Sequence, residues 1–320
     1  MTNTTAAAKR ALGNSGLTIA PLVLGGNVFG WTADRAAGFA VLDAFVAGGG
    51  TMIDTADVYS AWVPGHAGGE SETLIGEWLR HSGRRDDVLI ATKVGMLAGD
   101  GGDGLAPARI AAAVDASLRR LGTDRIDLYF AHRDDPAVPL AEPLDAFDRL
   151  VRAGKVRAIG ASNFTGPRLD EAANVAAAHG LTAFSVVQPH YNLLERTEFE
   201  TTLLPVVRER GLGVMPYYGL AAGFLTGKYR RTTDLTGARA TGAGRYLDAR
   251  GLAMLGALDL VAARHAANPA RIALAWLMAR PCITAPIASA TSAAQVADLI
   301  AAMHITLTAD DIAALDAAGG

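Results

Sequence analysis

Short apolar segments alternate with longer amphipathic segments along the whole chain, and this alternation limits the folds that it can adopt. Eight segments have the composition of buried strands: residues 17–24, 51–54, 88–93, 126–132, 156–162, 184–190, 213–217 and 283–288. Between them lie stretches with helical periodicity, several of which begin at Asp, Ser, Thr or Pro and end at Gly. Eight strand–helix units without a break in composition predict a single α/β domain over residues 1–320, a closed (β/α)8 barrel of the TIM type.

A doubly wound sheet is the other architecture that such alternation could build. That fold would carry a G-x-G-x-x-G turn after its first strand, and the sequence LGGNVFGW at residues 24–31 does not fit one. Four segments depart from the regular rhythm: long loops at about 60–69 and 218–247, an extra helix at 268–280, and a C-terminal helix at about 308–317 that starts at Thr308. Long loops on barrels are commonly functional.

Charge and cysteine content exclude several classes of partner. The formal net charge is -3 and the pI about 6.2, so neither nucleic acid nor an anionic membrane is expected as a partner. No run of about 18 apolar residues is present. The single cysteine, Cys282, excludes an internal disulfide and is expected to be buried and inert. Together these features predict a cytoplasmic globular protein whose partner is a small molecule.

Polar side chains end most of the predicted strands. The active site of a (β/α)8 barrel lies at the C-terminal ends of its strands, and the residues found there are Asp54, Lys93, His132, Ser162, Asn163, Gln188 and Tyr217. Each has an ordinary structural explanation by itself, such as a turn cap or a solvated lysine. Independent accidents would not place all of them on one rim, so the pattern predicts an active site. The seven histidines include no H-x-H pair, so a metal-dependent hydrolase is not favoured and no metal is expected.

Seven longer stretches make the chain similar to the aldo-keto reductase superfamily from about residue 10 to 317. They read IDTADVYS, GESETLIGEWL, VLIATKVG, DLYFAH, GKVRAIGASNF, VVQPHYNLLER and PYYGLAAGFLTGKY. The resemblance implies NAD(P)H-dependent reduction of a carbonyl, or the reverse oxidation, by a catalytic tetrad of Asp54, Tyr59, Lys93 and His132. In that tetrad Tyr59 donates the proton, Lys93 is expected to lower the tyrosine pKa, and Asp54 to balance the lysine. His132 would orient the substrate carbonyl.

The resemblance also implies where the cofactor binds. The nicotinamide would contact Ser162, Asn163, Gln188 and Tyr217; the pyrophosphate, Tyr218, Gly219, Leu220, Ala221, Ala222, Gly223 and Lys228; and the adenosine end, Ser289, Ala290, Thr291, Gln295 and Asp298. Gly26, Asn27 and Asp54 are also expected to contact the cofactor. NADP(H) is the family's usual cofactor. Residues 281–320 contain no Lys or Arg to match its 2′-phosphate, so NAD(H) stays an alternative. Four arginines of the long loop could supply the missing cation: Arg230, Arg231, Arg239 and Arg245.

The substrate pocket is expected around the first strand end and the first long loop. The residues predicted there are Val28, Phe29, Trp31 and Trp62, with Pro64 and His66 beside its mouth. Polar aldehydes, sugars, ketones and pyridoxal-like compounds all stay open as substrates. The second functional hypothesis is a non-catalytic or regulatory cofactor-binding protein on the same fold, as in channel-associated members of the superfamily. The intact tetrad argues against it.

Overall fold

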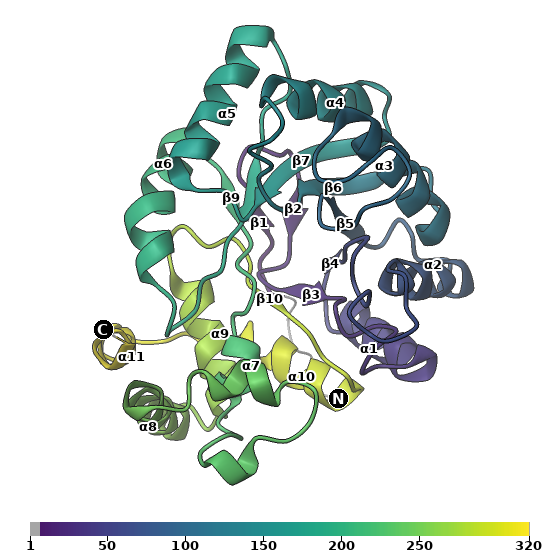
Figure 1. Ribbon diagram of the computed structural model, residues 1–320. Helices are drawn as coiled ribbons and strands as arrows, with labels where there is room; N and C mark the ends of the chain where they lie inside the picture. Colours follow the sequence, from purple (N-terminus) through teal and green to yellow (C-terminus); the bar gives the residue numbers. More distant parts are fainter. Residues whose placement is uncertain (1–6, 320) are drawn as a thin grey trace.

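Eight parallel strands form the centre of the molecule, and helices surround them (Figure 1). The structure is a computed structural model that describes residues 7–319. In the order in which they pair, the strands are β10 (Ile287–Ala288), β3 (Val23–Gly25), β4 (Met52–Asp54), β5 (Leu89–Val94), β6 (Ile126–Ala131), β7 (Val156–Ser162), β8 (Val186–Gln188) and β9 (Gly213–Val214). All neighbours in this order are parallel, so the carboxyl ends of the strands share one rim.

Backbone hydrogen bonds join the two ends of this strand order. The amide of Ile287 donates to the carbonyl of Pro216 at 2.9 Å, and that of Thr284 donates to the carbonyl of Val214 at 2.9 Å. These bonds link the β9 segment to the β10 segment and close the sheet on itself. The predicted (β/α)8 barrel is therefore confirmed.

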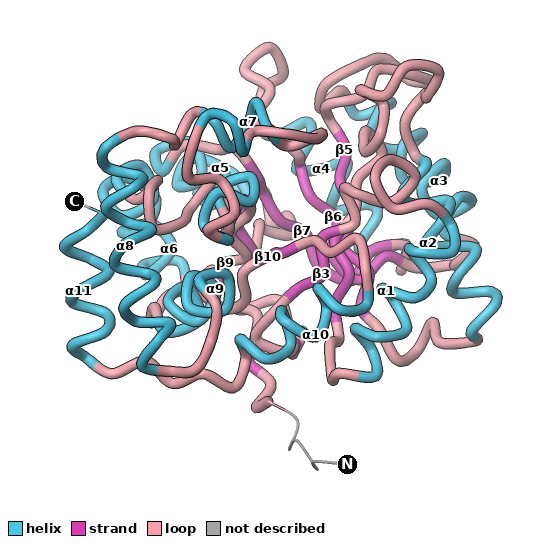
Figure 2. The backbone as a smooth tube through the Cα atoms, turned by 90° about the horizontal axis from the view of Figure 1, so that it is seen from below, coloured by secondary structure: helices cyan, strands magenta, loops and turns pink. Residues whose placement is uncertain are grey.

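Helices cover the outside of the barrel. They are α1 (Arg35–Ala47), α2 (Glu70–Ser82), α3 (Pro107–Leu121), α4 (Ala141–Arg152), α5 (Gly166–His179), α6 (Leu204–Arg210), α9 (Pro269–Ala279) and α10 (Ala293–Ala302). Two further helices, α8 (Ala249–Arg264) and α11 (Ala309–Gly319), lie side by side in both views (Figures 1 and 2). Local chemistry sets several of the ends: the side chain of Asn268 caps α9, the extra helix that the sequence predicts.

A β-hairpin fills the N-terminal end of the barrel. The predicted strand at 17–24 is wrong as one element, because it contains β2 (Thr18–Ile19), which pairs antiparallel with β1 (Arg10–Ala11), and β3. Pro21, which has no amide hydrogen, lies between the two pieces. Leu12 and Ile19 are fully buried against residues from inside the barrel. Figure 1 shows β1 and β2 inside the ring of helices.

The long segment after β9 contains short helices and lies at the opposite end from the hairpin. It includes η2 (Ala221–Thr226), η3 (Thr232–Asp234) and α7 (Ala240–Gly244). No helix within residues 7–319 combines the length and the apolar character that crossing a bilayer requires. Cys282 is only half-buried, so the expectation that it is buried is wrong. It lies in the turn between α9 and β10, where Arg208 Nε contacts its sulfur at 3.4 Å.

Candidate active site

A cavity of about 960 Å³ opens on the rim formed by the carboxyl ends of the strands. The last residues of five strands line it: Gly25 of β3, Asp54 of β4, Ser162 of β7, Gln188 of β8 and Ala288 of β10. The long segment after β9 contributes a further wall, including Lys228. The volume lies at the upper end of the range usual for small-molecule sites, roughly 300–1,000 Å³.

Three of the predicted tetrad residues form one buried hydrogen-bonded group. Lys93 Nζ lies 2.7 Å from Asp54 Oδ2 and 2.8 Å from the hydroxyl of Tyr59. It also donates to the carbonyl of Thr55 at 2.7 Å, so the ammonium has three acceptors. Lys93 is fully buried and Asp54 almost so. A buried ammonium needs a counter-charge, and the adjacent carboxylate provides it.

The turn after β4 holds Tyr59 in place. Its amide donates to the carbonyl of Ala56 at 3.2 Å. The next residue, Ser60, has a φ of 75°, an uncommon conformation for a residue other than glycine. The Ser60 hydroxyl donates to the carbonyl of Phe29 at 3.0 Å and anchors this backbone to the turn after β3. The phenol of Tyr59 is thereby positioned above Lys93.

Burial dominates the acid–base properties of this group. Burial raises the pKa of Tyr59 well above its ordinary value, and the Asp54 carboxylate adds to this shift. The expectation that Lys93 leaves Tyr59 with a lowered pKa is therefore wrong, because a phenolate loses more hydration than the nearby ammonium returns. Burial also lowers the pKa of Lys93, while Asp54 acts in the opposite direction. Tyr59 is accordingly protonated at neutral pH.

His132 lies beside Tyr59 directly after β6. The two rings are 6.0 Å apart and meet edge to face. Burial, followed by the charges of Lys93 and Arg133, lowers the pKa of His132 well below its ordinary value. The imidazole is therefore neutral at physiological pH and carries one N–H donor. Its Nδ1 is buried and, within the described residues, has no hydrogen-bond partner.

The residues predicted for the nicotinamide carboxamide are connected to one another. Gln188 Nε2 donates to Asp54 Oδ1 at 2.8 Å, and the hydroxyl of Ser162 donates to the carbonyl of Gln188 at 2.9 Å. Asn163 adopts a φ of 55° and accepts from the hydroxyl of Tyr217 at 2.8 Å. Tyr217 lies three residues after β9 and stacks on His190, with the rings 5.3 Å apart. All four predicted residues line the cavity.

The loop after Tyr217 has an uncommon backbone conformation. Positive φ angles occur at Tyr218 (55°), Ala221 (48°), Ala222 (55°) and Gly223 (91°). The amides of Ala221 and Gly223 donate to the carbonyls of Tyr218 and Leu220, at 2.7 and 2.8 Å, so this tight turn is held by its own hydrogen bonds. Of the predicted residues in this loop, Ala221 is buried and does not line the cavity, whereas the others do.

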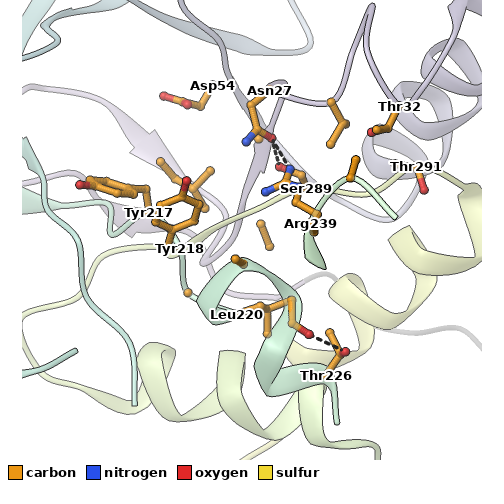
Figure 3. A pocket seen from close by; sticks show the side chains of 18 of the residues that line it. Asn27, Thr32, Asp54, Tyr217, Tyr218, Leu220, Thr226, Arg239, Ser289 and Thr291 are labelled. Atoms are coloured by element: carbon orange, nitrogen blue, oxygen red, sulfur yellow. Dashed lines mark hydrogen bonds between the residues drawn. The ribbon is translucent and has the colours of Figure 1, made fainter. Parts of the chain in front are cut away.

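One arginine of the long loop reaches the cavity. Arg239 Nη2 lies 3.4 Å from Asn27 Oδ1, which also accepts from the hydroxyl of Ser289 at 2.7 Å (Figure 3). Its guanidinium stacks over Trp31 and is half-buried, and within the described residues it has no carboxylate partner. The other three candidates are paired elsewhere: Arg230 with Asp259, Arg231 with Asp234 and Arg245 with Glu195. Among these four arginines, Arg239 is therefore the one that faces the cavity.

The predicted adenosine end contains a cation that sequence reasoning missed. Asp298 accepts from Nε of Arg271 at 2.9 Å and from Asn268 at 3.2 Å. Arg271 belongs to α9 and so lies just before the segment in which no Lys or Arg occurs. Gln295 lines the cavity and accepts from the amide of Thr291 at 2.8 Å. Ala290, the residue before Thr291, does not line the cavity. Gly26 is likewise outside the lining; its amide donates to the carbonyl of Asp54.

The predicted substrate pocket is partly wrong. Val28 and Trp62 line the cavity, but Phe29 is fully buried in the hydrophobic core, because the turn after β3 directs its ring inward. Trp31 stands behind Trp62, edge to face at 5.6 Å, and is not part of the lining. Pro64 and His66 are also outside it. The lining residues that the sequence did not single out include Thr32, Met96, Arg133, Thr236 and Asn268. Arg133 had the clearest signal, because it directly follows His132.

Comparison with known proteins places this geometry in a family. The sequence model of the aldo/keto reductase family matches residues 21–319. The chain is 36% identical over 303 residues to "Uncharacterized oxidoreductase YrpG" of Bacillus subtilis, covering 92% of this chain and 91% of that protein. It is 33% identical to "Protein tas" of Escherichia coli, covering 95% of both chains. It is also 32% identical to a "Putative voltage-gated potassium channel subunit beta" of Schizosaccharomyces pombe, covering 92% of this chain and 88% of that protein.

Proposed function

This chain belongs to the aldo/keto reductase family, and we propose that it is an NAD(P)H-dependent oxidoreductase that reduces an aldehyde or ketone to an alcohol, or catalyses the reverse oxidation. Tyr59 is the proton donor in this proposal. The observation that carries it is the buried Asp54–Lys93–Tyr59 group at the wall of a cavity large enough for small molecules. Within residues 7–319 no cluster of His, Cys, Asp or Glu is arranged to hold a metal ion, and the proposal uses none.

The cavity fits a nicotinamide dinucleotide at several points. Ser162, Asn163 and Gln188 offer neutral donors and acceptors of the kind that an amide needs. Lys228, which has no carboxylate partner among residues 7–319, suits a pyrophosphate, and Arg239 suits the 2′-phosphate of NADP(H). These residues would hold the cofactor, which when bound supplies a hydride to the carbonyl carbon.

The proton goes to the carbonyl oxygen from Tyr59. Because the phenol is protonated at neutral pH, it can donate as negative charge develops on that oxygen. Lys93, 2.8 Å away, stabilises the phenolate that remains until solvent restores the proton. Asp54 keeps Lys93 charged in its buried position. The neutral imidazole of His132 donates its N–H to the same carbonyl oxygen and orients the substrate.

A regulatory role is the alternative that one relative raises, since its printed name is that of a potassium channel subunit. The complete hydrogen-bonded group of Asp54, Lys93 and Tyr59 favours catalysis, because a protein that only binds cofactor does not need a buried ion pair beneath a phenol. The test is the loss of reduced-nicotinamide absorbance with a generic aromatic aldehyde. Cofactor binding without any turnover over a broad aldehyde and ketone panel would support the alternative and refute the proposed function.

A further inference from the structure

The mouth of the cavity is unusually apolar for a solvent-facing surface. Five large hydrophobic side chains are exposed within the described residues, and three of them line this cavity: Trp62 (48%), Met96 (44%) and Tyr218 (45%). Exposed apolar side chains gathered at one opening mark a binding surface. Tyr218 belongs to the loop predicted for the cofactor, but the proposed function gives no role to Trp62 or Met96.

Trp62 extends the group of aromatic side chains around Tyr59 toward the mouth of the cavity. Trp62 meets the ring of Tyr59 at 6.1 Å and that of Trp31 at 5.6 Å, both edge to face. His132 meets Tyr59 from another direction at 6.0 Å. A flat ring that carries a carbonyl would therefore find aromatic partners while its oxygen reaches Tyr59, since aromatic rings pair well with one another.

Arg133 adds a charge to the same opening. It follows His132, lines the cavity and is exposed. Within residues 7–319 its side chain makes no ion pair and no hydrogen bond. The adjacent carboxylate, Asp134, pairs with Arg168 instead. Its guanidinium therefore lacks a protein partner and is free to bind an anion.

The cofactor's phosphates are not the expected partner of Arg133. The free cations proposed for them, Lys228 and Arg239, belong to the segment after β9, next to β10 in the closed barrel. Arg133 follows β6, which lies four strands from β10 in the order of eight. It is therefore on the opposite side of the rim, beside His132 at the reacting end.

We propose that the substrate is a flat aromatic aldehyde or ketone bearing an anionic carboxylate or phosphate group, with its ring against Trp62 and its anionic group at Arg133. This inference rests on the proposed function and specifies its substrate class. The reaction is the one described above: hydride to the carbonyl carbon and the Tyr59 proton to its oxygen.

The test compares substrates that differ only in charge. The wild-type enzyme with saturating reduced cofactor is assayed with the meta and para isomers of carboxybenzaldehyde and with their uncharged methyl esters. We expect kcat/KM to favour at least one acid over its ester by about tenfold, the scale of one charge-assisted hydrogen bond. This preference should shrink as ionic strength rises, because the arginine is exposed.

Two variants and one control locate the effect. Arg133→Gln should bring the acid-to-ester ratio close to one, and the ratio cancels any change in His132 that both substrates share. Arg149→Gln, which removes an exposed arginine of α4 paired with Asp145, should leave the ratio and the activity unchanged. Trp62→Ala should reduce the preference for carboxybenzaldehyde over the aliphatic acid succinic semialdehyde, while the acid-to-ester ratio persists.

The outcomes separate the two proposals. Reduction of the esters with no preference for either acid, or a preference that survives Arg133→Gln, overturns the substrate class and leaves the proposed function standing. Equal use of carboxybenzaldehyde and succinic semialdehyde by the wild type overturns the aromatic part. No reduction of any of these aldehydes by a protein that binds the cofactor overturns both.

Discussion

Gln188 Nε2 donates to Asp54 Oδ1 at 2.8 Å, joining residues that are 134 positions apart in the sequence. They end β8 and β4, which lie four strands apart in the barrel and so face each other across its rim. The second oxygen of Asp54 accepts from Lys93. One carboxylate thus connects a residue proposed to hold the nicotinamide amide with the lysine beneath the proposed acid.

Replacing Tyr59 by Phe should lower kcat by about a hundredfold or more, because it removes the proton donor. The Kd for reduced cofactor, measured by fluorescence titration, should change little, since the ring remains. The matched control is Tyr191→Phe, which removes the buried hydroxyl that donates to Glu200 at 2.7 Å, outside the cavity. Near-normal turnover in Tyr59→Phe would show that another group supplies the proton.

Replacing Lys93 by Met should cripple turnover and move the pH profile of alcohol oxidation. Oxidation needs the phenolate of Tyr59 as base, and removal of the ammonium leaves burial and Asp54 in place, which are the largest of the effects that raise the tyrosine pKa. The rising limb of kcat/KM against pH should therefore shift to higher pH.

The control for that experiment is Lys155→Met, which removes a half-exposed lysine paired with Asp115. Its profile should match the wild type. Circular dichroism of both variants checks that they are folded. An unshifted profile with full activity in Lys93→Met would mean that the lysine has no part in the proton transfer.

Cofactor preference should be weak. The segment that follows β10 offers neutral donors rather than a cation, and Arg271 is paired with Asp298. We expect NADPH to be preferred over NADH by less than about a hundredfold, near 2.7 kcal/mol. Titration of both reduced cofactors at one ionic strength measures it, and a preference of several thousandfold would reveal a phosphate clamp not recognised in the structure.

Arg239 should account for what preference there is. Arg239→Ala should bring the NADPH-to-NADH ratio of Kd values close to one, because Arg239 is the loop arginine that faces the cavity without a carboxylate partner among the described residues. Arg245→Ala, whose arginine pairs with Glu195, should leave the ratio unchanged. The reverse result would place the phosphate contact elsewhere on the loop.

Asp57 should make the folded protein less stable as pH rises. Burial and Glu72 raise the pKa of this carboxyl to about 7, although Arg109 lies 3.2 Å from it and acts in the opposite direction. Between about pH 4 and pH 7 the Asp57 carboxyl is ionised in the unfolded chain but stays protonated in the folded chain. The free energy of unfolding therefore falls as the pH rises through this range.

Asp57→Asn removes this dependence. The free energy of unfolding of the variant, relative to the wild type, should rise between about pH 4 and pH 7 and then level off. Urea denaturation at a series of pH values measures it. Asp145→Asn, at an exposed carboxylate of α4, is the control and should show a flat difference over this range. A flat difference for Asp57→Asn as well would place the Asp57 pKa near its ordinary value.

Residues at strand ends were the part of the site that the sequence could indicate. Asp54, Lys93 and His132 each end or follow an apolar run, and consecutive parallel strands must bring such positions to one rim. The turn after β3 could not be predicted, because whether Phe29 faces the core or the cavity depends on two or three backbone angles. Sequence motifs pointed to a pocket wall, and the structure has a core residue instead.

Effects that depend on burial or on distant partners were also hidden. The acidity of Tyr59 depends on how much water the closed barrel removes, which no local pattern reports. Arg230 and Arg239 look equivalent in the sequence, yet Asp259 of α8 engages the first and leaves the second facing the cavity. The contact between Gln188 and Asp54 likewise exists only because the sheet closes.

The hairpin of β1 and β2 has a kinetic consequence. Its residues Leu12 and Ile19 are fully buried among side chains from inside the barrel, at the end away from the rim that carries Asp54. In the proposed function, cofactor and substrate would both enter from the rim side, through the mouth of the cavity. The residues proposed for the nicotinamide, such as Ser162 and Gln188, lie deep in the cavity, whereas Trp62 and Met96 stand exposed at its mouth. In the proposed function a substrate at the mouth would block the exit of the cofactor, so we expect ordered binding: the cofactor enters first and the substrate second, and the product leaves before the oxidised cofactor.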